Sequence, residues 1–349
     1  MTSPVALARH LHQAATSRLV AAAAIALIAG ACKDKSGTAP PDPRGIRKVL
    51  VGVQVDPTAL HASGEFVLRL VPLDGKGDVI LSDGLDVTPK ITAPVTQTLA
   101  PTAQHVQLPD TRPVAAAISI DDSRSMRTSD PTNQRAAAAK LFWSELFSAN
   151  PANEVALLAF GAERPTAPFA RTALLESWTS DAARLEAGVN GLIATGSTYL
   201  YQSTAEVAPW IASSRPAASY RHVLLLVTDG LPTDSGAADA AITAAAGAQI
   251  PIYTVGLGPA SDHSPSSSAA AVDRLRTLAN RTGGVYAGAE NNTELTTTFE
   301  SLAKLTTEGA LLVTVRMNPA PAAGTVVAGT VRVANKFGGA AEPWSFTAP

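Results

Sequence analysis

Three segments that end or follow predicted strands carry oxygen-bearing side chains. Asp121, Ser123 and Ser125 stand in "DDSRS" after the apolar run "VAAAISI", Thr198 stands in "TGSTYLY", and Asp229 follows "LLLVT". The alternate spacing of the first three lets an extended or turning backbone aim their side chains at one point. Two carboxylates and three hydroxyls, without a thiol or an imidazole, suit a hard cation.

From about Thr111 the sequence alternates between strand-like and helix-like segments. We predict strands over 114–120, 155–161, 172–179, 222–230, 251–258 and 284–289, and helices over 130–149, 180–192, 197–213, 236–248, 268–283 and 292–306. Apolar runs without polar alternation indicate strands that are covered on both faces. We therefore expect an α/β domain with a doubly wound, mostly parallel sheet of about six strands, in which ligands gather at the carboxyl edge.

The order Asp-x-Ser-x-Ser, then a distant threonine, then a distant aspartate after an apolar strand resembles the metal-ion-dependent adhesion site of von Willebrand factor type A domains. The resemblance extends over residues 111–307 and includes "HVLLLVTDGLPTD", "PIYTVGLG" and "TGGVYAGAENNTELTTTFESLA". It implies a Rossmann-like fold in which the metal is held by the five residues above (Asp121, Ser123, Ser125, Thr198 and Asp229).

The resemblance also implies what such a site does. The hydroxyls bind Mg²⁺ directly or through water, the aspartates act largely through water, and Ca²⁺ or Mn²⁺ can substitute. Mg²⁺ takes six oxygen ligands, so this set leaves one position for an outside donor. In the family that donor is usually a carboxylate from a protein partner, and we expect the same kind of partner here.

Composition excludes some other classes of protein. The chain has 349 residues, of which 46% are hydrophobic and 16% charged, so it can bury a sizeable core. Its formal net charge is −2, and its lysines and arginines are scattered along the sequence. We therefore expect no nucleic-acid partner.

Residues 1–31 have the pattern of a lipoprotein signal peptide. Positive charge precedes the apolar run "LVAAAAIALIAGA", which ends at Cys32, the only cysteine of the chain. The small residues before Cys32 resemble the bacterial lipobox, in which the thiol is lipidated, so we expect a lipid anchor to the membrane in the bacterial cell envelope. Lys33 after the cysteine favours the outer membrane. A lone cysteine forms no intrachain disulfide.

The regions beside the α/β domain differ from it in pattern. Residues 32–46 are rich in Pro, Gly and charge and are typical of a flexible tether. Residues 47–110 show short strands and turns, weakly similar to bacterial immunoglobulin-like repeats, and residues 308–349 return to β character. Because the C-terminal segment cannot bury its own apolar face, we expect it to complete a β-sandwich-like module with residues 47–110.

Competing chemistry finds little support in the sequence. Ser123 has no nearby histidine or lysine to act as its base, and the histidines outside the signal peptide lack ligand spacing for zinc. A metal-assisted hydrolase would need a general base facing the open coordination position. We therefore predict that the protein is not an enzyme. Asp130 is placed to cap the helix that follows it. We expect Asp122 and Asp130 to be solvated loop acids, with a role in tuning the charge near the metal as the alternative. We expect Asp122 and Arg124 to face outward, where they could tune the approach of a partner.

Two functions remain open. The favoured one is a divalent-cation-dependent, adhesion-type protein-binding domain displayed on a lipid-anchored envelope protein. The alternative is a structural or assembly component of an envelope complex, in which the metal mainly stabilises the domain.

Overall fold

The computed structural model of the protein describes residues 42–161, 164–230 and 232–349. The predicted signal peptide, the lipidation residue Cys32 and most of the predicted tether lie outside these ranges. Within them, no helix is long and apolar enough to cross a membrane.

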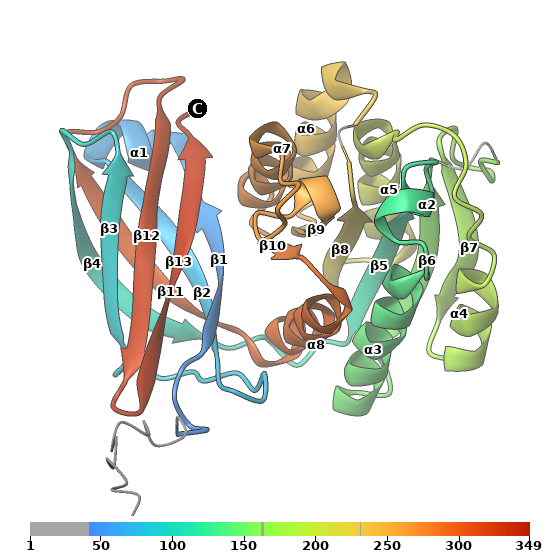
Figure 1. Ribbon diagram of the computed structural model, residues 1–349, viewed down its shortest axis with the longest axis horizontal. Helices are drawn as coiled ribbons and strands as arrows, with labels where there is room; N and C mark the ends of the chain where they lie inside the picture. Colours follow the sequence, from blue (N-terminus) through green and yellow to red (C-terminus); the bar gives the residue numbers. More distant parts are fainter. Residues whose placement is uncertain (1–41, 162–163, 231) are drawn as a thin grey trace, which may run out of the picture. The chain divides into compact units, whose positions relative to one another are not determined.

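The α/β domain is built on six strands in the order β10-β9-β8-β5-β6-β7 (Figure 1). Along the chain these strands are β5 (Val114–Asp121), β6 (Glu154–Phe160), β7 (Thr172–Thr179), β8 (Arg221–Thr228), β9 (Ile252–Leu257) and β10 (Tyr286–Ala289). All neighbours pair in parallel except β7, which is antiparallel to β6. The predicted fold class, a doubly wound α/β sheet with a small β module beside it, is confirmed. The sheet is larger than the six predicted strands, because four strands of the β module continue it to ten.

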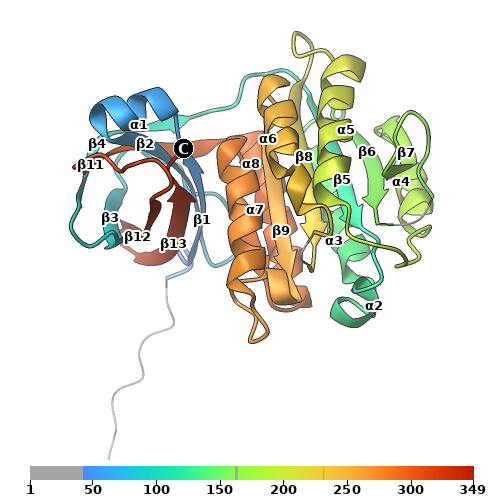
Figure 2. The ribbon, with the colours of Figure 1, turned by 90° about the horizontal axis from the view of Figure 1, so that it is seen from above.

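Helices cover both faces of this sheet (Figure 2). Alternate residues of β5 point to opposite faces: Ala116 and Ile118 belong to the apolar cluster that includes α3, α4 and α8, whereas Ala115 and Ala117 belong to the cluster with α5, α6 and α7. The helices are α2 (Met126–Ser129), α3 (Gln134–Ala149), α4 (Ala182–Val189), α5 (Leu200–Ser214), α6 (Ala238–Gly247), α7 (Ala269–Arg281) and α8 (Asn292–Glu308).

Helix α3 begins four residues later than the sequence predicts. Asp130 precedes it by several residues and its carboxylate accepts the backbone N–H groups of Gln134 (2.6 Å) and Arg135 (3.0 Å), so it caps the first turn from a distance. Asp130 also forms a buried ion pair with Arg135 at 2.8 Å. It is therefore a buried structural residue. The prediction that it caps this helix is confirmed, and its prediction as a solvated loop acid is wrong.

The β module combines strands from both sides of the α/β domain in the sequence. One layer has the order β4-β11-β2-β1, and the second has the order β13-β12-β3. The strands are β1 (Lys48–Gln54), β2 (Glu65–Leu73), β3 (Asp86–Ala93), β4 (Thr98–Gln107), β11 (Ala310–Asn318), β12 (Val326–Asn335) and β13 (Gly338–Thr347). All their pairings are antiparallel, and β11 lies between β4 and β2.

The core of the β module is shared between its two sequence segments. Phe66 of β2 packs against Trp344 and Phe346 of β13, with ring centroids 5.4 and 5.1 Å apart. Ile46, the last residue of the expected tether, has no exposed surface and packs in the same core. A short helix, α1 (Pro57–Ser63), begins where the Asp56 carboxylate accepts the N–H of Thr58 and ends at Gly64 in the left-handed conformation.

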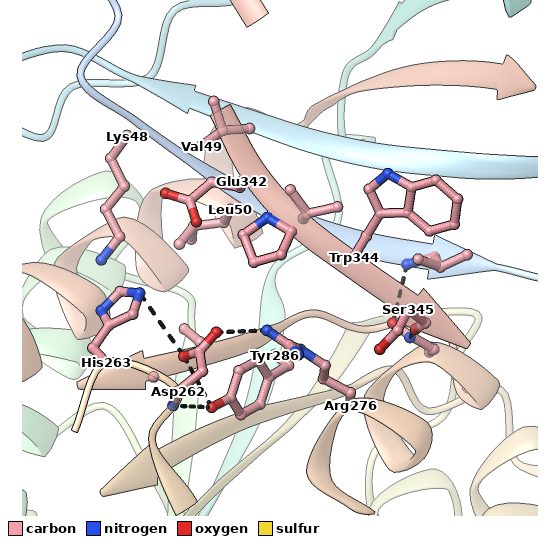
Figure 3. A pocket seen from close by; sticks show the side chains of 16 residues that line it. Lys48, Val49, Leu50, Asp262, His263, Arg276, Tyr286, Glu342, Trp344 and Ser345 are labelled. Atoms are coloured by element: carbon pink, nitrogen blue, oxygen red, sulfur yellow. Dashed lines mark hydrogen bonds and ion pairs between the residues drawn. The ribbon is translucent and has the colours of Figure 1, made fainter. Parts of the chain in front are cut away.

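Strand β1 also meets the α/β sheet, through one antiparallel residue pair, Val51 with Tyr286. Beside this contact lies a cavity of about 40 Å³, lined by charged groups of β1, β13 and α7 and of the segment after β9 (Figure 3). Asp262 there forms an ion pair with Arg276 at 2.5 Å and accepts the hydroxyl of Tyr286 at 3.2 Å. Asp262 thus links α7 with β10 beside this contact.

We predict that Phe66 and Phe346 are energetically coupled. Each change to alanine should lower the free energy of unfolding by about 3–5 kcal/mol, because each opens a cavity in the shared core. The double variant should lose about 0.5–1.5 kcal/mol less than the sum, measured by chemical denaturation. As a control, Phe66→Ala with Phe142→Ala should be additive, because Phe142 belongs to a different apolar cluster. Additivity of the Phe66 and Phe346 changes would contradict the shared core.

Candidate metal site

The two candidate carboxylates are brought together by neighbouring strands. β5 and β8 are parallel and pair Ile120 with Val227, so their carboxyl ends lie at the same edge of the sheet (Figure 1). Asp121 is the last residue of β5, and Asp229 directly follows β8. Both side chains are buried, with 0% and 1% of their surface exposed. The carboxyl edge predicted from the strand pattern is therefore where these residues lie.

Hydrogen bonds connect four of the five predicted ligands. Asp121 accepts the backbone N–H of Ser123 at 2.8 Å. The hydroxyls of Ser123 and Ser125 lie 3.1 Å apart, and Ser125 donates to Asp229 at 2.9 Å. The "DDSRS" loop thus turns both serine hydroxyls toward the aspartate that follows β8.

Thr198 comes from a separate loop and lines the same cavity as Ser123, Ser125 and Asp229. This cavity has a volume of about 450 Å³. The carbonyl oxygen of Thr198 accepts both the backbone N–H and the hydroxyl of Thr233, at 2.9 and 3.1 Å. The loop after β8 therefore holds the threonine at the cavity.

Gly161, at the end of β6, permits the close approach of the first loop. Its φ is +97°, and a Cβ at this position would lie 2.8 Å from the backbone nitrogen of Ser123. A larger residue would force the serine away from the site.

The electrostatics of the site favour a cation. Burial, and then the charge of Asp229, raise the pKa of Asp121 to about 6. Within residues 42–161, 164–230 and 232–349, neither carboxylate forms an ion pair with a basic side chain. Two buried carboxylates that repel each other are costly unless positive charge compensates them. The donor set and its unbalanced charge therefore fit a divalent cation.

Asp122 has a different role from the one that the sequence predicts. Its side chain is completely buried and accepts the backbone N–H groups of Ile193 (2.8 Å) and Ala194 (2.6 Å). Arg135 and Arg164 approach it at 3.8 and 3.5 Å. The prediction of a solvated, outward-facing acid is wrong, because the loop leading to Thr198 folds over Asp122 and shields it.

Asp122 therefore connects two loops of the site. Its backbone carbonyl accepts the N–H of Thr195 at 2.7 Å, and its carboxylate holds Ala194, which has the unfavourable φ of +50°. The N–H of Arg124 donates in turn to Gly196 at 3.2 Å. These contacts fix the loop that carries Thr198 against the loop that carries the serines.

Two further hydroxyls support the site and were missed by sequence reasoning. Thr228 donates to Asp121 at 2.6 Å, and Ser129 donates to Asp229. Thr228 directly precedes Asp229, and Ser129 lies four residues after Ser125, one turn along α2. The helical spacing would have indicated Ser129 if residues 126–129 had been recognised as a helix.

Metal sites of another type are not evident. No group of three or more His, Cys, Asp or Glu side chains is placed to hold a metal ion in the part of the chain that the structure describes. Only two carboxylates belong to the candidate site, and hydroxyls supply the rest of its donors.

The fold and the site at the carboxyl edge of β5 and β8 define the class of this domain. It is a doubly wound α/β domain with an oxygen-lined site where its central strands end. The family described as von Willebrand factor type A domain matches residues 117–231, which span both the "DDSRS" loop and Asp229. The chain therefore contains a von Willebrand factor type A domain. No curated protein matches the sequence significantly.

Solved structures provide further comparisons. The chain is similar to a von Willebrand factor type A protein from Catenulispora acidiphila, with 14% identity and a TM-score of 0.44 over 86% of this chain and 74% of that one. It is also similar to the vWF domain of the type V pili tip protein Mfa5 from Porphyromonas gingivalis, with 15% identity and a TM-score of 0.42 over 56% and 95%. A third is an aerotolerance-related membrane protein from Bacteroides fragilis, with 18% identity and a TM-score of 0.40 over 55% and 98%.

We predict that Asp122→Ala releases the loop that leads to Thr198. The free energy of unfolding should fall by about 3 kcal/mol, because a buried charge pair and two buried N–H groups lose their partner. Amide hydrogen exchange at Ile193 and Ala194 should accelerate.

Asp130→Asn is the matched control, because Asp130 is also buried and paired with Arg135. It should accelerate exchange at Gln134 and Arg135 and leave Ile193 and Ala194 protected. Unchanged protection of Ile193 and Ala194 in Asp122→Ala would contradict the anchoring role.

Proposed function

We propose that the protein is a non-enzymatic, divalent-cation-dependent binding protein whose type A domain captures a protein partner. The observation that carries this proposal is the pair of buried carboxylates, Asp121 and Asp229, which share one sheet edge with hydroxyl donors and no basic partner in the described ranges. Such a pair is stabilised by a cation and costly without one.

Each residue of the site would have a defined part in holding Mg²⁺. Ser123, Ser125 and Thr198 present neutral hydroxyls to the cavity, and Asp121 and Asp229 supply the compensating negative charge. When bound, the cation offers an electrophilic coordination position to an oxygen of the partner. A carboxylate is the partner group that we propose.

The residues around the cavity support binding over catalysis. Among its described lining residues there is no histidine or lysine, and the guanidinium of Arg124 is a hydrogen-bond donor without an acceptor atom. The carboxylates of the site, Asp121 and Asp229, would be held by the cation, so neither would be free to act as the base of a water molecule at the open position.

The alternative is a structural role for the metal, and one observation favours it. Loops after β5, before α5 and after β8 all meet at this site, so a cation there would stabilise the domain without any partner. Binding and stability measurements on the same variants separate the two functions.

We predict that capture of a partner from bacterial envelope extracts requires a divalent cation. Wild-type protein should retain the partner with Mg²⁺ and lose it with chelator, and Ser123→Ala and Asp229→Ala should not retain it in either condition. Ser213→Ala, an exposed serine of α5, is the matched control and should behave as wild type. A partner that both variants and the chelator leave bound would contradict the proposal.

Thermal melts of Asp229→Asn complete this test. With chelator the variant should be at least as stable as wild type, because one of two repelling carboxylates is removed. Mg²⁺ at a hundred times its Kd should stabilise wild type by about 2.7 kcal/mol and the variant by little. A cation-dependent melt without cation-dependent capture would favour the structural role.

We also propose that the protein is anchored to the bacterial envelope by lipid on Cys32. The signal-like residues 1–31 and the lipobox-like sequence before the cysteine support this proposal. In a detergent phase separation the wild-type protein should enter the detergent phase, whereas Cys32→Ser should stay in the aqueous phase. Identical partition of the two proteins into the aqueous phase would contradict it.

A further inference from the structure

The cavity at the candidate metal site is lined mainly by hydroxyl groups. Four hydroxyl residues line it beyond the predicted ligands: Ser129, Ser197, Thr233 and Ser268. Apart from Asp229, the one charged side chain among the described lining residues is Arg124.

The structure fixes the backbone of Arg124 and leaves its side chain exposed. The backbone N–H donates to Gly196 at 3.2 Å, which places Arg124 where the serine loop meets the threonine loop. Arg135 and Arg276, by contrast, are paired with Asp130 and Asp262. Within residues 42–161, 164–230 and 232–349, the guanidinium of Arg124 has no such carboxylate partner.

With a divalent cation bound, the positive charge of Arg124 would have no counterpart in the site and would be available to a partner. A divalent cation would be matched by the two charges of Asp121 and Asp229, so the positive charge of Arg124 would remain at the mouth. A guanidinium binds a carboxylate through two parallel N–H donors, a geometry that an ammonium does not reproduce.

We propose that Arg124 is a specificity-determining residue that binds a second acidic group of the partner. The partner segment presents two acidic side chains close together, of which one meets the cation and the other meets Arg124. This inference rests on the proposed function, because it needs a cation and a partner carboxylate at the site. Beyond that function, we infer that the partner carries a second acidic group and that Arg124 binds it.

The test measures binding of fluorescent glycine-rich peptides by fluorescence polarisation, in Mg²⁺ and in chelator. The peptides carry one aspartate, two adjacent aspartates, two aspartates separated by glycine, one phosphoserine, or only asparagine. In Mg²⁺ the wild-type protein should bind one of the two-aspartate peptides about tenfold more tightly than the one-aspartate peptide. Arg124→Gln should reduce this ratio to about one, and Arg124→Lys should keep part of it.

Arg184→Gln is the matched control, because Arg184 is an exposed arginine of α4 and does not line the cavity. It should keep the wild-type ratio. A ratio near one in wild type, a ratio that survives Arg124→Gln, or an equal loss of both kinds of peptide in Arg124→Gln would overturn the inference alone. Tightest binding of the phosphoserine peptide would overturn it in favour of phosphate recognition. No cation-dependent binding of any peptide would contradict the proposed function itself.

Discussion

The parallel pairing of β5 with β8 is the constraint on which the site depends. Each strand is buried on both faces by helices, so neither can slide relative to the other without moving apolar side chains out of register. The strand ends are therefore fixed, and with them Asp121 and Asp229. The loops that bring the hydroxyls are then fitted to this rigid edge.

Three buried aspartates lie at this edge, and they differ in whether the protein compensates their negative charge. Asp122 is surrounded by positive groups and N–H donors, so its charge is satisfied by the protein. Asp121 and Asp229 receive hydrogen bonds from neutral hydroxyls and a backbone N–H and keep their charge uncompensated. Two neighbours in the sequence therefore differ in role: Asp122 organises the loops, while Asp121 accepts hydrogen bonds from Ser123 and Thr228 at the end of β5.

Sequence patterns predicted most of the α/β elements because most of the buried strands are continuous apolar runs and most of the helices are long, whereas the four-residue helix α2 was missed. The start of α3 was less predictable, since Asp130 caps it from four residues away and the intervening turn has no apolar period. Helix α1 has a clear signal in Asp56 and Pro57, but at seven residues it is too short to show a helical period.

The five candidate ligands could be predicted from the sequence, whereas the residues that hold their loops in place were harder to predict. The alternate spacing in "DDSRS" identifies the side chains of the first loop, and the strand pattern places Asp229 at the same edge of the sheet. Whether Asp122 faces solvent depends on where the distant loop around Ile193 folds, and that loop has no periodic pattern of its own. Ser129 likewise becomes visible only when α2 is known to be helical.

The placement of β11 beside β4 has a mechanical consequence. The chain leaves the β module for the α/β domain after β4 and returns at β11, and Gln107 at the end of β4 is paired with Ala310 at the start of β11. A pull on the α/β domain is thus carried by two covalent links that start from adjacent ends of paired strands. Tension would be shared between both strands and would load the hydrogen bonds between β4 and β11 together with those between β11 and β2, so that neither strand is peeled away alone.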